Sequence, residues 1–377
     1  MSVTTPTLDV DTAVVGGGLV GAALAYGMRA QGADLVVLDE GDRAHRAARG
    51  NFGLVWVQGK GLGMPGYGAW TQRSAREWPR LAADLLAQTG LDVALRQGGG
   101  VHVCLTAAEL DARAARLREL MAQPGFPAYD VETLDGAALA RRLPGLGRDV
   151  AGGTFCALDG DCNPLRLLRA LHAAIERAGC RYRPDAAVDA IEPCERRFIL
   201  RTRGGVVVAR RVVLAAGLAN ARLAPQVGLA APVRPNKGQV IVLERMRPFL
   251  PLPVDTLRQT DEGTVLIGDS QQDAGYDETL DPAVLAAMAR RAVAAFPALG
   301  EARVNRAWAA LRVMSPDGFP IYAQSRSYPG AFVAACHSGV TLAAAHAHVL
   351  APAIAGGALP DECGSFTPER FDVRAAA

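Results

Sequence analysis

One arginine interrupts an apolar stretch near the C-terminal end of the chain, WAALRVMSPDGFPIY at residues 308–322. If this stretch is a strand, its side chains alternate between two faces, and Arg312 shares a face with Trp308 and Ala310. A guanidinium on an apolar face is costly unless an anion binds to it. The residues alone leave two anions open: a carboxylate of the protein in a structural salt bridge, or an acidic ligand.

Three glycines near the N-terminus have the spacing of a nucleotide-binding turn. Gly16, Gly18 and Gly21 fit G-x-G-x-x-G, between an apolar strand expected at residues 9–15 and a helix of small residues. Such glycines allow a tight turn and a close approach of the backbone to a pyrophosphate, which lies at the positive helix N-terminus. Asp39 ends the next apolar stretch, where an acid accepts hydrogen bonds from ribose hydroxyls. This order predicts a dinucleotide site; the alternative is a glycine-rich turn without a ligand.

The segment after Asp39 favours FAD over NAD as the dinucleotide. RAARGNFGLVWVQGKG, at residues 46–61, is rich in glycine and aromatic residues, as expected of a loop laid along an extended cofactor. A plain NAD unit would continue into another regular helix. A further apolar strand follows much later, at residues 212–216, and ends in Gly217. This split layout disfavours the alternative of an NAD(P)-dependent dehydrogenase.

Composition and charge argue against several other classes of protein. The net charge is +2 and the arginine pairs are scattered, so we expect no nucleic-acid partner. The seven cysteines form no C-x-x-C pair, which predicts reduced thiols in the cytoplasm and no metal site. The apolar run 13–28 contains five glycines and is too short to span a membrane. No basic segment precedes it, so we expect a cytoplasmic protein, at most peripherally associated with the inner face of the cell membrane.

Several short motifs, in this order, resemble those of a flavoprotein family. They are GGGLVG, Asp39, RGNFG, VVLAAG, NKGQV, LIGDSQQDAGYD, LRVMSPDGFPI and CHSGVTLA. Over residues 8–356 the chain resembles the FAD-dependent D-amino acid oxidase-like proteins, which include glycine oxidase and sarcosine oxidase. RGNFGLVWVQGKG and CHSGVTLA are most similar to the flavin subunits of opine oxidase, hydrogen cyanide synthase and D-hydroxyproline dehydrogenase.

The resemblance implies an α/β fold with two domains. A Rossmann-like FAD-binding domain would be discontinuous and formed by residues 1–60, 150–225 and 308–377. An α+β substrate-binding domain with a mostly antiparallel sheet would take residues 61–149 and 226–307. Apolar spacing independently predicts helices over 70–86, 164–178 and 282–296, the second of them capped by Asn163, and strands over 238–244 and 264–269.

The same resemblance implies which residues bind FAD. The chain departs from the family at Ala48, where relatives usually carry a phosphate-contacting serine, and in a shorter C-terminal loop with Cys336 in place of a glycine. No cysteine lies between Cys194 and Cys336, where some relatives attach the flavin, so noncovalent FAD is expected. The residues expected to bind it are Gly16, Gly18, Gly21, Asp39, Arg49, Gly50, Asn51, Val188, Gly217, Gly339, Val340 and Thr341.

For catalysis, the resemblance implies oxidation of the C–N bond of a small amino or imino acid, of the glycine, D-amino acid, proline, hydroxyproline or opine type. Flavin N5 accepts a hydride, while the protein orients the substrate and balances its charge. Arg312 occupies the position that binds the substrate carboxylate in glycine oxidase-like relatives, which favours a substrate over a salt bridge. His337 and Lys237 are further catalytic candidates; a structural histidine and an exposed strand end are the alternatives. Lys60 could favour anionic reduced flavin, and Tyr276 either lines the pocket or only packs.

The route by which electrons leave is also implied by the resemblance. Its closest members are subunits of hetero-oligomers, and this chain shows no metal carrier of its own. We therefore expect partner electron-transfer subunits, one of which could hold an iron–sulfur cluster, and slow reaction with oxygen. Two alternatives stay open: a non-catalytic flavin subunit that only relays electrons, against which the retained Arg312 speaks, and a true oxidase that forms hydrogen peroxide.

Overall fold

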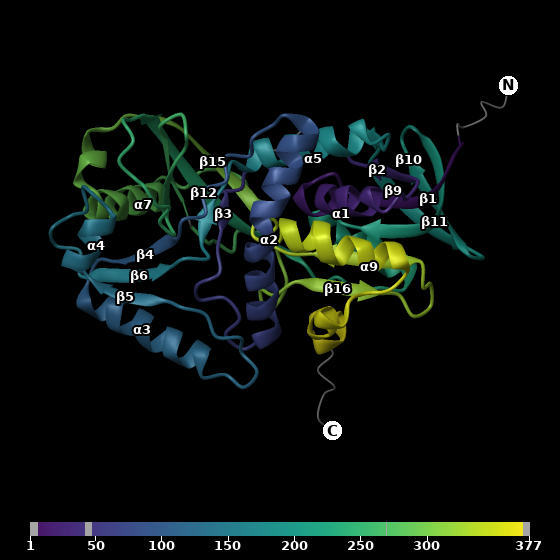
Figure 1. Ribbon diagram of the computed structural model, residues 1–377. Coiled ribbons are helices and arrows are strands. Elements are labelled where there is room, and N and C mark those ends of the chain that lie inside the picture. Colours follow the sequence, from purple (N-terminus) through teal and green to yellow (C-terminus); the bar gives the residue numbers. More distant parts are fainter. Residues whose placement is uncertain (1–6, 42–46, 269, 372–377) are drawn as a thin grey trace.

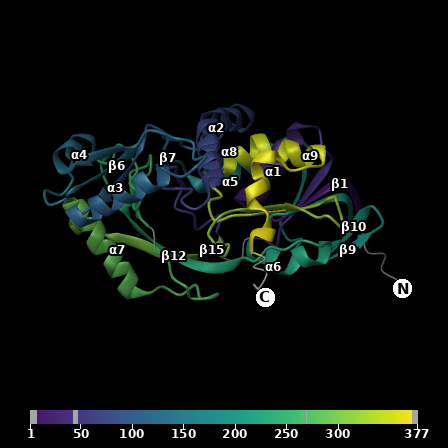
Figure 2. The ribbon, with the colours of Figure 1, turned by 90° about the horizontal axis from the view of Figure 1, so that it is seen from below.

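A computed structural model describes residues 7–41, 47–268 and 270–371 of the 377-residue chain. Two sheets lie side by side along the long axis of the molecule, each with its own helices, and helix α2 (Pro65–Thr89) lies near their junction (Figure 1). Viewed from below, β12 (Arg234–Arg245) extends from the second sheet toward the first (Figure 2). In the part of the chain described here, no helix is both long and apolar enough to cross a membrane.

The first sheet has a parallel centre and antiparallel edges. Its central strand β1 (Thr7–Val15) runs parallel to β2 and β11, while β8 and β17 extend the parallel pairing on either side. β16 pairs antiparallel with β17, and β9 and β10 form an antiparallel extension of β11. The bounds are β2 (Leu35–Leu38), β8 (Arg181–Arg183), β9 (Val188–Cys194), β10 (Arg197–Thr202), β11 (Gly205–Leu214), β16 (Ile321–Gln324) and β17 (Ala331–Ala335). Strands buried on both faces explain the continuous apolar runs in the sequence.

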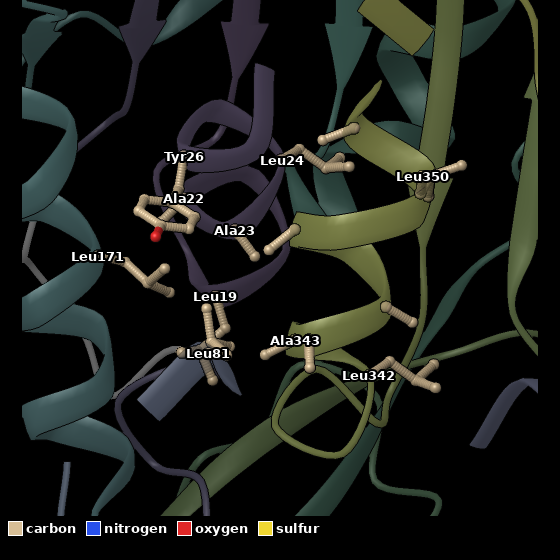
Figure 3. Close-up of a cluster of buried hydrophobic side chains, with 14 of the residues drawn as sticks. Leu19, Ala22, Ala23, Leu24, Tyr26, Leu81, Leu171, Leu342, Ala343 and Leu350 are labelled. Carbon is tan, nitrogen blue, oxygen red and sulfur yellow. The ribbon is translucent and has the colours of Figure 1, made fainter. Parts of the chain in front are cut away.

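Helix α1 (Leu19–Ala30) is the centre of the helical layer on this sheet. It packs between α5 (Pro164–Arg177) and the C-terminal helical segment, and almost all of its residues are buried (Figure 3). Gly27 permits the close approach, because a Cβ there would lie 2.0 Å from Ala347 O. The predicted cap of α5 is confirmed, since Asn163 Oδ1 accepts hydrogen bonds from the first-turn amides. The C-terminal segment comprises α8 (Ala343–Ala345), a wider turn (His346–Leu350) and α9 (Ala351–Gly356), and the short α6 (Asn220–Leu223) follows β11.

The second sheet is mostly antiparallel. Strands β5–β6–β4 are joined to β13–β14–β12–β15 by a bridge between Val101 and Val254. Helices α4 and α7 pack on this sheet around a separate apolar core, while α3 contacts β4 and β6 and contributes to a smaller apolar cluster. The bounds are β4 (Gly100–Cys104), α3 (Ala107–Met121), β5 (Glu132–Asp135), α4 (Gly136–Arg142), β6 (Gly152–Cys156), β13 (Leu257–Gln259), β14 (Thr264–Ile267), α7 (Pro282–Ala295) and β15 (Val304–Met314).

This architecture confirms the predicted fold class, an α/β sheet combined with a mostly antiparallel second sheet. Two of the predicted domain boundaries cut through the second sheet. The boundary at 150 assigns β6 to the FAD-binding domain, although β6 pairs with β4 and β5. The boundary at 308 divides β15, which pairs with β12 along most of its length. Strand pairing therefore places both strands in the second sheet.

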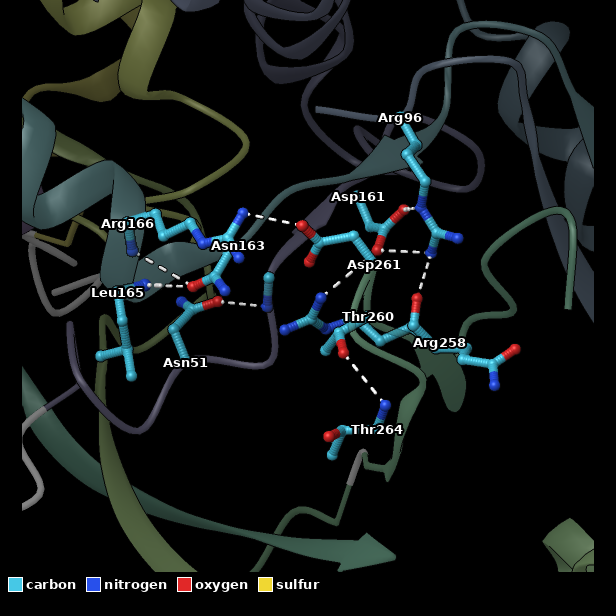
Figure 4. A network of polar contacts seen from close by, with 12 residues as sticks. Asn51, Arg96, Asp161, Asn163, Leu165, Arg166, Arg258, Thr260, Asp261 and Thr264 are labelled. Carbon is cyan, nitrogen blue, oxygen red and sulfur yellow. Dashed lines mark hydrogen bonds and ion pairs between the residues drawn. The ribbon is translucent and has the colours of Figure 1, made fainter. Parts of the chain in front are cut away.

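A polar network ties the loop after β2 to both halves of the molecule (Figure 4). Asp161 lies on β7 (Gly160–Asp161), which pairs with β3 (Leu54–Val55). Its carboxylate accepts from Arg96 Nη2 at 2.9 Å and from Arg258 Nη1 at 3.3 Å. Arg258 comes from β13 of the second sheet and its side chain is buried. Because β3 directly follows the RGNFG segment, this network fixes the backbone that leads into the candidate site.

Candidate functional site

A cavity of about 710 Å³ lies where the central parallel strands of the first sheet end. Gly16 adopts φ +103°, and a Cβ there would meet Ala215 O at 2.4 Å. A Cβ at Gly21 would lie 1.9 Å from Gly16 O, so Gly21 packs the turn and does not line the cavity. A Cβ at Gly18 would have Ala48 Cβ as its nearest neighbour, at 3.6 Å. This side of the turn is therefore open to a ligand. The geometry at these glycines therefore suits a tight turn at Gly16, close packing at Gly21 and the approach of a ligand at Gly18.

Asp39 lies at the rim of this cavity, immediately after β2. Its Oδ2 accepts from Gly17 N at 2.6 Å and its Oδ1 from Gly41 N at 2.9 Å. These bonds orient the carboxylate next to the glycine turn. His172, on α5, contacts Gly17 O at 2.7 Å through Nε2, and its ring lies 4.5 Å from the ring of Tyr182. Sequence reasoning missed His172 and Tyr182, because no spacing links either residue to the glycine turn.

The other residues predicted to bind FAD divide between two adjoining cavities. Arg49, Asn51, Val188, Gly217 and Gly339 line the first cavity, together with Gly16, Gly18 and Asp39. Gly50, Val340 and Thr341 line a second cavity of about 270 Å³. The two cavities share the wall residues Ala47, Asn51, Leu311 and His337.

Thr341 joins the C-terminal loop to the loop that follows β2. Its Oγ1 accepts from Trp56 N at 3.2 Å and donates to Leu54 O at 3.2 Å. Ser74 Oγ of α2 donates to Thr341 O at 2.6 Å from the other side. The loop CHSGVT is therefore held against β3 and α2, where it forms part of the wall of both cavities.

Arg312 lies on the wall of the second cavity. The pairing of β12 with β15 places Asn236 opposite Arg312 and Gly238 opposite Ala310. Arg312 Nη1 donates to Ser270 O at 2.7 Å and to Asn236 Oδ1 at 3.3 Å. The guanidinium lies over Gly238, where a Cβ would meet Nη1 at 2.4 Å. Glycine at this position therefore gives the guanidinium its place on the wall.

His337 lies on the walls of both cavities and is uncharged at neutral pH. Burial, together with the positive charges of Lys60 and Arg312, lowers the pKa of His337 to about 3. Its Nε2 lies 3.1 Å from Ser338 Oγ. His337 is thus placed to contact a ligand, but it cannot act as an acid–base group that titrates near neutrality.

Lys237 lies outside both cavities, although the sequence suggested either a catalytic residue or an exposed strand end. Its side chain is buried, and Nζ donates to Asp277 Oδ2 at 2.7 Å and to Thr279 O at 3.1 Å. Its ammonium is compensated by a neighbouring segment, so the geometry offers no support for a catalytic Lys237.

Sequence reasoning also missed the carboxyl group beneath the second cavity. Asp159 is fully buried, and its Oδ1 accepts from Val57 N at 2.5 Å and from Gln58 N at 3.3 Å. Its Oδ2 has no hydrogen-bond partner, and burial raises the pKa of Asp159 to about 7. Asp159 therefore anchors the segment that carries Trp56 and Lys60 to the cavity wall. An isolated acid before a glycine gives no sequence signal for this function.

Comparison with known proteins identifies the family. Residues 11–353 match the family described as FAD dependent oxidoreductase. The chain belongs to this family. The B subunit of opine oxidase from Rhizobium meliloti is 45% identical over 368 residues, covering 98% of this chain and 99% of the relative. Hydrogen cyanide synthase subunit HcnC of Pseudomonas aeruginosa is 26% identical and covers 97% of each chain.

The fold of this FAD-dependent oxidoreductase also matches a solved structure. The crystal structure of glycine oxidase from Geobacillus kaustophilus aligns with a TM-score of 0.87 at 23% identity, covering 96% of this chain and 98% of that chain. The cofactor is FAD, and the first cavity suits it. The open turn at Gly18 and the start of α1 would hold the phosphates, and the Asp39 carboxylate would accept from the ribose. Among the described residues, no cluster of side chains suits a metal ion.

Proposed function

We propose that this FAD-dependent oxidoreductase oxidises the C–N bond of a small amino or imino acid and passes the electrons to a partner subunit. The observation that carries the proposal is the position of Arg312 on the wall of a small cavity that adjoins the FAD cavity. A guanidinium binds a carboxylate through two parallel hydrogen bonds and thereby fixes its orientation. An α-carboxylate held there would place the C–N bond at a defined position beside the cofactor.

Bound FAD would take a hydride from the carbon that bears the nitrogen, the nitrogen would lose a proton, and water would hydrolyse the resulting imine. The chain's own residues orient the substrate and exclude water. Ser270 O and Asn236 Oδ1 hold Arg312 Nη1 in place, so the guanidinium does not have to reorganise when a carboxylate binds. His337 is neutral, so it adds no charge that would compete with Arg312 for the substrate carboxylate.

The names of the relatives support both parts of the proposal. Opine oxidase and glycine oxidase are named for amino-acid-type substrates. The opine oxidase relative and the hydrogen cyanide synthase relative are each named as one subunit of an enzyme. We therefore favour an amino or imino acid of the glycine, proline or opine type, and partner subunits that receive the electrons.

Anaerobic titration of the purified holoprotein tests the proposal. Glycine, D- and L-proline, hydroxyprolines, sarcosine and opines are added in turn, and loss of the oxidised flavin absorbance is recorded. We expect at least one of these amines to bleach the flavin, and an artificial dye to reoxidise it faster than oxygen does. A flavin that none of them reduces would leave only an electron-relaying subunit. Rapid, stoichiometric peroxide formation by the isolated chain would make it an oxidase.

A further inference from the structure

Two cationic side chains from different elements line the second cavity. Arg312 reaches it from β15, and Lys60 reaches it from the segment that follows β3. Both positive charges contribute to the lowered pKa of His337, so both act on the same part of the wall. A single cation is enough to bind one carboxylate, and the proposed function uses only Arg312. Lys60 therefore has no assigned partner in the reaction.

The Lys60 ammonium contacts neutral groups of the protein. Nζ donates to Ser338 Oγ at 2.9 Å and to Tyr67 OH at 3.4 Å, and the two hydroxyls are 2.8 Å apart. The ring centroid of Tyr67 lies 5.6 Å from Nζ. Within residues 7–41, 47–268 and 270–371, no carboxylate lies within ion-pair distance of Lys60. The hydroxyls thus orient the ammonium but do not neutralise it.

Among the described residues, the other titratable groups that line this wall form no ion pair with Lys60. His337 is neutral near pH 7, because its pKa is about 3. Asp255 is the acidic residue among the described residues that line the cavity, and its Oδ2 lies 2.8 Å from His102 Nδ1. The polar wall residues Asn51, Gln239 and Gln271 carry no charge. An ammonium whose own contacts are neutral hydroxyls can bind an anionic group of a ligand that enters this cavity.

We propose that Lys60, oriented by Ser338 and Tyr67, binds a second carboxylate of the substrate, so that the preferred substrate is a secondary amine with an acid group on each side of its nitrogen. The inference rests on the proposed function, because it concerns the same cavity and takes Arg312 as the site of the first carboxylate. Two anchors fix a flexible amine better than one, because rotation about the first anchor no longer moves the C–N bond. Lys60 is then a specificity-determining residue.

Binding of unreactive acids tests this inference without any turnover. Glutarate has the length of iminodiacetate with CH₂ in place of the amine, and pentanoate is the same chain with one carboxylate replaced by methyl. Each acid is titrated into the oxidised holoprotein, and its dissociation constant is read from the change in the flavin spectrum. We expect the wild-type chain to bind glutarate on the order of 10- to 100-fold more tightly than pentanoate.

Substitution of Lys60 should remove this preference selectively. Lys60→Met should weaken glutarate binding by about 10- to 100-fold and change pentanoate binding by less than about threefold. Lys60→Arg should retain most of the preference, because it keeps the charge. Lys60→Gln serves if the Met variant fails to retain FAD, since the amide keeps a donor for Ser338. Arg210→Met removes one positive charge from an exposed side chain of β11 that lines neither cavity, and it should leave both constants unchanged.

Three results would overturn the inference. A wild-type protein that binds both acids equally has no second anion site. A Lys60→Gln or Lys60→Met variant that loses both acids to the same extent shows that Lys60 only supports the wall. Sulfite, which adds to the flavin itself, serves as a further probe. A Lys60 variant that keeps the preference for glutarate but binds sulfite more weakly shows that the Lys60 charge acts on the cofactor. The proposed function fails separately, through the absence of flavin bleaching by any amine, whatever the binding preference is.

Discussion

Arg312 is held by contacts with the protein and is also proposed to bind the substrate carboxylate. Its Nη1 is held by Ser270 O and Asn236 Oδ1, and the plane of the guanidinium rests on Gly238. A lysine at this position would offer a point charge without the planar fork. The proposal that Arg312 binds the substrate carboxylate can therefore be separated from a purely structural function by comparing kinetics with stability.

We expect Arg312→Met to lower kcat/KM by about a hundredfold to a few thousandfold, because breaking a poorly solvated pair with a carboxylate costs about 3–5 kcal/mol. Arg312→Lys should recover part of the loss. Anaerobic flavin reduction gives the kinetic constants, and thermal unfolding gives the stability. A Met variant with a markedly lower Tm but nearly normal kinetics would show that the guanidinium serves the fold instead of the substrate.

The buried carboxyl group of Asp159 predicts that the stability of the folded protein falls as the pH rises toward 7. Burial raises the pKa of its carboxyl from 3.8 to about 7, so the folded protein retains a proton that the unfolded chain releases. The resulting stabilisation is fully present below the unfolded pKa and is lost as the pH rises toward 7. Asp159→Asn resembles the protonated form, so its stability relative to the wild type should increase by roughly 2–3 kcal/mol between about pH 5 and pH 8.

Urea unfolding of both proteins at several pH values measures this difference. Asp111→Asn, on the exposed face of α3, is the matched control and should run parallel to the wild type. If Asp159→Asn also runs parallel, the buried carboxyl is charged in the folded state and is compensated in some other way.

The segment between β14 and α7, residues 271–281, forms part of the wall of the first cavity, and we call it the strap. Tyr276, which is 71% exposed, and Glu278 line that cavity, although they follow a strand of the second sheet. The strap is fastened to β12 by the buried Lys237, which pairs with Asp277 and donates to Thr279 O. The ion pair holds the pKa of Asp277 well below its usual range. We therefore expect Lys237 to contribute to the retention of FAD through this segment.

Lys237→Met should lower the Tm and raise the dissociation constant of FAD by about tenfold, because loss of the ammonium removes the contacts that hold Asp277 and Thr279 of the strap. FAD retention is measured by the fluorescence of released flavin. Arg234→Met is the control, because its ion pair with Asp273 on the same strap is exposed and contributes little. A Lys237→Met variant that is less stable but binds FAD normally would show that the strap does not hold the cofactor.

The elements that could be predicted from sequence are those with a local signature. The glycine turn, Asp39 and the cap of α5 are read from spacing alone, and each lies where it was expected. Lys237 could not be placed, because its partner Asp277 lies 40 residues further along on an irregular segment without periodicity. The pairing of β6 with the second sheet could not be predicted for a similar reason, since the partners of β6 are fixed by tertiary structure.

At the scale of the whole molecule, the state of Cys336 bears on whether FAD is covalently attached. Cys336 lines the first cavity, and burial raises the pKa of its thiol to about 12. A thiol that stays protonated at neutral pH is a poor nucleophile. We therefore expect acid precipitation to release all of the FAD into the supernatant, where its absorbance is measured. Flavin that stays with the pellet, and that Cys336→Ala releases, would instead reveal a thioether.

The order of the strands has a consequence for synthesis on the ribosome. β1, β2 and β11 of the first sheet are complete once residue 214 has emerged, but their neighbour β17 begins only at residue 331. The loop CHSGVT follows β17 and forms part of the wall of both cavities. Since chains emerge from the N-terminus, the glycine turn is synthesised long before this part of the wall. FAD can be fully enclosed only after almost the whole chain has been made, so we expect the cofactor to be captured late, largely after translation.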